Sequence, residues 1–149
     1  MSSLETFSQV RTDSNRAVTL VGYQGEWLED QHELFERLED TLTRIELRNQ
    51  GKPYLVIMPG LKPFVGIEAT TMNDVPTDML IVTIPEDHYA VFRFEKAWIG
   101  AFWETVCTKE NQLKYRIDLD KPRFEMITPE LQAAGAIEWY IPTKIEGST

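Results

Sequence analysis

The chain has 149 residues, with 15 basic and 24 acidic side chains, and therefore a formal net charge of −9. This length fits one domain with a substantial hydrophobic core, and the 42% of apolar and 11% of aromatic residues exclude a disordered chain. The negative charge argues against direct binding to nucleic acid, which needs clustered basic side chains, and favours neutral or cationic partners.

Hydrophobic patterning predicts strands that alternate with two helices. Apolar and β-branched runs bounded by Gly and Pro predict the strands, and apolar residues at helical spacing predict the helices. In chain order the expected elements are a strand over 17–23, a helix over 28–49, strands over 54–58 and 63–70, a loop over 73–78, strands over 79–84 and 88–94, a helix over 96–108, and strands over 123–127 and 137–141. The apolar stripe of the first helix consists of Leu28, Phe35, Leu38, Leu42 and Ile45.

This order of elements predicts a single α+β domain over residues 16–143. It repeats a β-α-β-β unit, so we expect two pseudo-symmetric β-α-β-β modules that form one antiparallel sheet. Two helices should lie on one face of the sheet, with a central ligand cleft between them. The exposed edge strands of such a sheet would also allow a homodimer.

Both ends of the chain are expected to be tails. Residues 1–15 are polar, although Leu4, Phe7 and Val10 can dock on the domain, and residues 144–149 follow the last predicted strand. The N-terminus has neither the basic nor the apolar region of a secretory signal, and no apolar run approaches the ~18 residues of a membrane span. We therefore expect a cytoplasmic protein.

The first predicted helix is strongly acidic. Residues 26–48 include eight acidic and three basic side chains, so more than half of the net charge lies there. A solvated helix face explains this pattern without any function. The functional alternative is a rim that attracts cations or a basic partner.

The sequence carries no familiar catalytic or metal-binding motif. It has no Gly-rich phosphate loop and no HExxH, and its two histidines, His32 and His88, lie on separate elements. The single cysteine, Cys107, excludes an internal disulfide, and without an organised histidine partner we expect a buried structural thiol. We therefore expect neither a metal nor a cofactor.

Strand alternation leaves the place of Glu125 open. Phe124 and Met126 share one face of their strand and Glu125 has the other, so Glu125 either faces solvent or points into the cleft. In the cleft, a lone carboxylate would be costly to bury unless a cationic ligand compensated it. The aromatic residues of the helix over 96–108, and Tyr89 beside a turn, are likewise either core residues or walls of a ligand site.

Several short motifs follow one another in a defined order. They are Ile84-Pro85, Tyr89-Ala90-Val91-Phe92, Trp103, Phe124-Glu125 and Tyr140-Ile141-Pro142, preceded in the first half by Val21-Gly22 and Gly66. Their order and spacing resemble the GyrI-like small-molecule-binding domains, a family that includes effector-binding domains of bacterial AraC- and MerR-type transcription regulators. The resemblance covers about residues 16–143, and it implies a pair of β-α-β-β modules.

The resemblance also implies a ligand site. In family members that bind drugs, the glutamate of the "FE" strand lies at the bottom of an aromatic cleft and pairs with cationic amphipathic ligands. Carried over, that role falls on Glu125. The implied walls of the cleft are Tyr89, Trp103 and Tyr140, with Trp98 and Phe64 added as candidates that no motif covers. We expect a stand-alone domain, because 149 residues leave no room for a helix-turn-helix domain.

Three functions follow from these observations. The favoured one is a binding domain for cationic or aromatic amphipathic small molecules, serving sequestration, sensing or drug resistance. The second is a hydrolase of reactive, cyclopropane-type molecules, which some stand-alone GyrI-like proteins resemble, with Glu125 as general base beside the Tyr89 hydroxyl. The third is a protein-interaction module, similar to family members that act on DNA gyrase.

Overall fold

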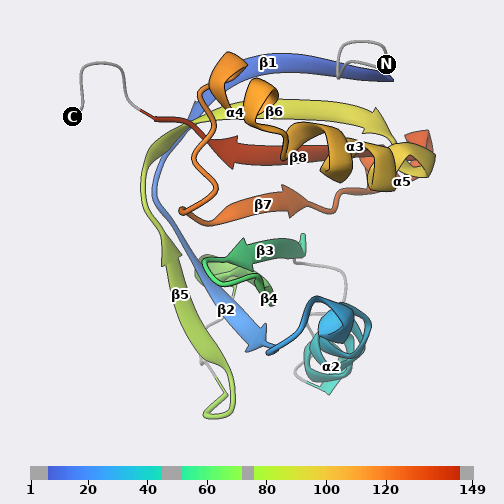
Figure 1. Cartoon of the computed structure of the whole chain (residues 1–149). Coiled ribbons are helices and arrows are strands. Elements are labelled where there is room, and N and C mark those ends of the chain that lie inside the picture. Colours follow the sequence, from blue (N-terminus) through green and yellow to red (C-terminus); the bar gives the residue numbers. More distant parts are fainter. Residues whose placement is uncertain (1–6, 45–51, 72–75, 145–149) are drawn as a thin grey trace.

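One antiparallel sheet organises the fold. The structure, a computed structural model, describes residues 7–44, 52–71 and 76–144, and within these ranges eight strands form a single sheet (Figure 1). Their order across the sheet is β1-β6-β8-β7-β3-β4-β2-β5. The strands are β1 (Ser8–Asn15), β2 (Val18–Gln24), β3 (Tyr54–Met58), β4 (Lys62–Glu68), β5 (Leu80–Ile84), β6 (Asp87–Glu95), β7 (Arg123–Met126) and β8 (Ala136–Pro142).

Helical segments connect the strands. They are the 3-10 helices η1 (Leu28–Asp30), η2 (Ala69–Thr71) and η3 (Lys96–Trp98), and the α-helices α2 (Gln31–Arg44), α3 (Ile99–Val106), α4 (Lys109–Lys114) and α5 (Pro129–Ala134). α2 packs on β2 and β4, whereas α3 turns Phe102 onto Phe92 of β6, with the ring centroids 5.4 Å apart. The two helices therefore cover different halves of the sheet (Figure 1).

The sheet has the same arrangement when followed outward from its centre in either direction. One half reads β3-β4-β2-β5 and the other reads β7-β8-β6-β1. In each half a strand, a helical segment and two further strands follow in chain order (β2, α2, β3, β4 and β6, α3, β7, β8), and antiparallel pairing of β3 with β7 joins the halves. This confirms the α+β class and the doubled β-α-β-β order. Each predicted strand corresponds to one of β2 to β8.

Residues 8–15, which were expected to belong to an N-terminal tail, form strand β1. Residues 8–15 pair with β6 along its whole length, from Ser8 opposite Phe94 to Asn15 opposite Asp87. The polar composition reflects an edge strand whose side chains are mostly exposed, whereas its backbone is held by the sheet. Val10 packs against the core as expected, whereas Leu4 lies outside the described residues.

The first predicted helix is shorter and is anchored partly by other residues. η1 and α2 cover 28–44, and the predicted residues 45–49 lie outside the described residues. The same holds for residues 73–75 of the predicted loop and for residues 145–149 of the C-terminal tail. Leu38 and Leu42 are buried as expected, but Leu34 and Thr41 complete the stripe and Leu28 is 37% exposed. The acidic side chains of α2 are all exposed, as in a solvated face.

The short helices α4 and α5 were not expected from the hydrophobic pattern. α4 begins after Thr108, whose hydroxyl accepts a hydrogen bond from the Asn111 N–H at 3.3 Å. α5 begins after Thr128 with Pro129 in its first turn and ends at Gly135, whose φ of 66° is left-handed. A capping threonine, a proline in the first turn and a terminal glycine are the local signals of a helix, so α5 is predictable from the sequence.

Buried side chains form a cluster on each face of the sheet. The face that carries α2 and α3 holds the larger cluster, which includes Leu38, Phe92, Phe102 and Trp139. The second cluster lies on the opposite face and consists of Leu20, Tyr54, Val56, Phe64, Ile84, Tyr89, Val91, Phe124 and Tyr140. Its members come from both halves of the sheet. The strands that pass between the halves, β1 into β2 and β5 into β6, bend around this side (Figure 1).

Candidate ligand-binding cleft

A cavity of about 560 Å³ lies between α2 and α3, above the junction of β3 and β7. Its floor comes from the central strands and its sides come from the two helical segments. The apolar lining residues are Leu28, Phe35, Leu55, Ile57, Ile99, Trp103, Ile137 and Trp139, and the polar ones are Gln31, Lys96, Arg123 and Glu125. This cavity, called the central cleft below, occupies the position that the sequence predicts for a ligand cleft.

Glu125 lies in the floor of the central cleft. It sits opposite Trp139 in the β7–β8 pair, so strand geometry directs both side chains to the face that carries the helices. Among the described residues, no hydrogen bond or ion pair reaches its carboxyl group. Burial raises the pKa of Glu125 to about 7, although the positive charge of Lys96 opposes this rise. Of the two placements that alternation left open, the structure shows the cleft.

Trp103 forms an aromatic wall beside Glu125. Its ring meets that of Trp139 edge to face, with the centroids 5.0 Å apart. The Arg123 guanidinium lies over the Trp103 ring, 4.9 Å from its centroid. Glu125 and Trp103 are thus the two predicted site residues that the structure brings together.

Tyr89, Tyr140 and Phe64 are placed elsewhere. All three belong to the buried cluster on the opposite face of the sheet, where the Phe124 ring stacks on Tyr140 at 4.9 Å. They therefore do not line the central cleft with Glu125, because all three lie on the other face of the sheet. The expected pairing of Glu125 with the Tyr89 hydroxyl is excluded for the same reason.

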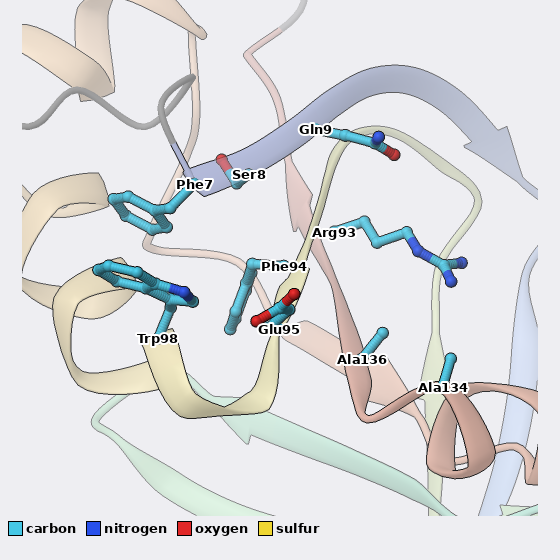
Figure 2. Close-up of a pocket in the computed structure, with 9 residues that line it drawn as sticks. All are labelled: Phe7, Ser8, Gln9, Arg93, Phe94, Glu95, Trp98, Ala134 and Ala136. Carbon is cyan, nitrogen blue, oxygen red and sulfur yellow. The ribbon is translucent and has the colours of Figure 1, made fainter.

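Trp98 lies in a separate surface groove of about 500 Å³ between the start of β1 and the end of α5. Its ring stacks on Phe7, with centroids 5.3 Å apart and planes at 15°. Figure 2 shows this stacked pair, with Phe94 and Glu95 beside it. Trp98 is 45% exposed and is not part of the central cleft.

Arg123 and Lys96 also line the central cleft, although no sequence motif singles them out. Arg123 is only 8% exposed, and burial lowers the pKa of its guanidinium. A signal was present, since Arg123 precedes Glu125 by two residues and must share its face of β7. Lys96 begins η3, and no local pattern connects that position with β7.

The single cysteine, Cys107, is not among the residues that line the central cleft. Cys107 is exposed at the C-terminal end of α3, one residue beyond the buried Val106, which corrects the expected buried thiol. Among the described residues, no three His, Cys, Asp or Glu side chains are grouped so that they could hold a metal ion. Within the same ranges, no helix is both long and apolar enough to cross a membrane.

The sequence matches no protein-family profile and no curated protein. Solved structures nevertheless share its fold. SAV2435 bound to tetraphenylphosphonium is 16% identical, with a TM-score of 0.63 over 91% of this chain and 94% of that chain. A Staphylococcus aureus protein named as a candidate transcription regulation protein is 13% identical, with a TM-score of 0.63 over 92% of this chain and 99% of that one. EcmrR, solved in a complex with DNA, is 10% identical, with a TM-score of 0.59 over 94% of this chain and 59% of its own.

The chain has the fold of the GyrI-like effector-binding domains. This confirms the resemblance that the motifs carried and the fold class that it implied. At 10–16% identity the likeness concerns the fold alone. In the GyrI-like fold of this chain, the central cleft occupies the junction of the two modules.

Proposed function

We propose that this GyrI-like domain binds small cationic aromatic molecules in the central cleft. The observation that carries the proposal is the Glu125 carboxyl group, which lies among apolar and aromatic side chains without a hydrogen-bonding partner in the described part of the chain. A ligand cation would supply that partner through a charge-assisted contact. The Trp103 ring would add a cation–π or stacking contact.

Two further observations support this proposal. SAV2435, which shares the fold, was solved with tetraphenylphosphonium, a cation that carries four aromatic rings. Helix α2 lines the central cleft with Gln31 and Phe35 and also carries exposed acidic side chains, which would raise the local concentration of cations. Such a domain would serve to sequester or to sense its ligand, as the effector-binding domains of regulators do in the family that the sequence resembles.

The proposal is tested with two probes of the same shape and opposite charge. Tetraphenylphosphonium and tetraphenylborate are titrated into the full chain, with calorimetry as the readout. We expect saturable binding of the phosphonium only. Replacement of Glu125 by Gln keeps the shape and removes the charge, and should weaken binding at least tenfold, which is about 1.4 kcal/mol.

Glu104→Gln is the matched control, because Glu104 lies on α3 beside Trp103 but is exposed. It should bind the phosphonium as the wild type does. Equal binding of the phosphonium and the borate, or unchanged affinity in Glu125→Gln, would refute the role of Glu125. If neither probe binds, the acidic face of α2 becomes the surface to examine for a protein partner.

A hydrolase is the second candidate, and the pKa of Glu125 favours it. A general base works best when its pKa lies near the working pH, and burial raises that of Glu125 to about 7. The Tyr89 hydroxyl takes no part, because Tyr89 belongs to the cluster on the other face of the sheet. Mass spectrometry of strained cyclopropane compounds incubated with the chain, with Glu125→Gln as the control, would detect turnover.

A further inference from the structure

Two buried N–H groups of the central cleft have no hydrogen-bonding partner among the described residues. In the part of the chain that the structure describes, the buried side-chain polar atoms without a hydrogen bond are Arg123 Nε and Trp139 Nε1. Both residues line the central cleft, and they are 8% and 2% exposed. Buried donors are normally paired, since an unpaired one loses its hydration without compensation. Both groups are donors, so the group that would satisfy them is an acceptor.

The two donors belong to one corner of the cleft. Because Glu125 pairs with Trp139, Arg123 lies diagonally across from Trp139 on the same face of the sheet. The Trp103 ring connects them, with the Arg123 guanidinium 4.9 Å from its centroid and the Trp139 ring 5.0 Å from it. A ligand group that enters this corner would therefore lie beside the two residues that carry these donors.

Arg123 differs in its partners from three other arginines, each of which lies beside a carboxylate. Arg11 lies 2.9 Å from Glu138, Arg93 lies 3.4 Å from the same carboxylate, and Arg37 lies 3.4 Å from Asp78. Arg123, the buried one, has no ion pair among the described residues. A guanidinium stays charged in proteins, so its burial here leaves a positive charge that no carboxylate of the described residues pairs.

We infer that the central cleft is built for zwitterionic aromatic ligands, whose carboxylate pairs with Arg123 and Trp139 while their cationic group pairs with Glu125. This inference rests on the proposed function and narrows its ligand class. The planar N–H fork of arginine matches a carboxylate. Arg123 and Glu125 are two residues apart on β7, so the two ligand charges should lie on the order of 7 Å apart.

The central cleft carries ionisable groups of both signs. Lys96 and Arg123 contribute two positive charges and Glu125 at most one negative charge. A ligand with only a positive charge would satisfy Glu125 but leave the buried Arg123 unpaired. A ligand with only a negative charge would satisfy Arg123 but meet the ionised Glu125. A ligand with both charges pairs with Glu125 and with Arg123, and it leaves the exposed Lys96 to solvent.

Three dyes with one xanthene skeleton test this inference. Tetramethylrhodamine is zwitterionic at pH 8, its methyl ester is cationic, and fluorescein is anionic. Fluorescence polarisation with the full chain at pH 8 gives their dissociation constants. We expect the zwitterion to bind at least tenfold more tightly than the ester, and fluorescein to bind most weakly. In Arg123→Met, which keeps the apolar stem, the zwitterion and the ester should agree within threefold.

Arg93→Met is the control, since Arg93 lines the groove of Figure 2 and not the central cleft. It should keep the tenfold preference for the zwitterion. An ester that binds the wild type as tightly as the zwitterion would overturn this inference and leave the proposed function intact. Absence of binding by all three dyes and by tetraphenylphosphonium would instead remove the proposed function. The wild-type comparison decides even if Arg123→Met fails to fold.

Discussion

Glu125 on β7 and Trp139 on β8 lie directly opposite each other, and both side chains enter the central cleft. This register places a carboxyl group beside a fully buried indole, at the junction of two modules. It also places their neighbours in the chain, Phe124 and Tyr140, on the opposite face, where their rings stack at 4.9 Å. The register of β7 and β8 therefore places Glu125 and Trp139 in the central cleft, and Phe124 and Tyr140 in the second core cluster.

The buried carboxyl group should make stability depend on pH. Below the unfolded pKa of about 4.5, Glu125 is neutral in both states and costs nothing. Between that value and the folded pKa of about 7, the unfolded chain ionises first, so stability falls as the pH rises. Glu125→Gln does not titrate. Its stability relative to the wild type should therefore increase by up to about 3 kcal/mol from pH 4.5 to pH 8.

Thermal denaturation of the wild type and Glu125→Gln at both pH values measures this difference. A difference between the two proteins that is the same at both pH values would contradict the burial of this carboxyl group.

The affinity for a cation should also depend on pH. A cation binds the ionised form of Glu125, and with a pKa of about 7 that form increases from about a tenth to about nine tenths between pH 6 and pH 8. Calorimetry should show tetraphenylphosphonium binding about tenfold more tightly at pH 8, whereas Glu125→Gln should bind equally at both. If the wild type bound tetraphenylphosphonium equally at pH 6 and pH 8, the cation would not pair with Glu125.

Trp103 and Tyr89 should respond differently to substitution. Trp103→Leu removes the aromatic wall of the cleft and should weaken tetraphenylphosphonium binding between about twofold and thirtyfold. Tyr89→Phe removes a hydroxyl on the other face and should leave that affinity unchanged. Calorimetry on both variants distinguishes these outcomes. Loss of binding in Tyr89→Phe would show that the ligand occupies the opposite face.

Gly22 is expected to tolerate no side chain. A Cβ atom there would lie 1.9 Å from the Val65 backbone oxygen on the neighbouring strand β4. The close backbone approach requires glycine, so Gly22→Ala should lower the thermal midpoint strongly or prevent folding. Gly100→Ala is the control, because a Cβ at Gly100, on helix α3, meets no atom within 4 Å. It should raise stability by about 0.5–1 kcal/mol.

Most elements were predictable because their signals are local. Alternation and β-branched runs predicted the strands β2 to β8, helical spacing predicted α2 and η3 with α3, and the order of motifs indicated the GyrI-like fold. The polar strand β1 was not predictable in this way. Its backbone is ordered by pairing with β6, more than seventy residues away, and not by any apolar pattern of its own.

The sequence by itself determined that Glu125 and Phe124 occupy opposite faces, and that Trp139 and Tyr140 do the same. Only the tertiary structure decided which aromatic residue shares the face of Glu125. The resemblance suggested Tyr140, and the register shows Trp139. The physical reason is that a shift of one residue moves every side chain of a strand to the other face, while register is set by contacts between distant segments. The same pairing brings Arg123 and Trp139 into one corner of the cleft.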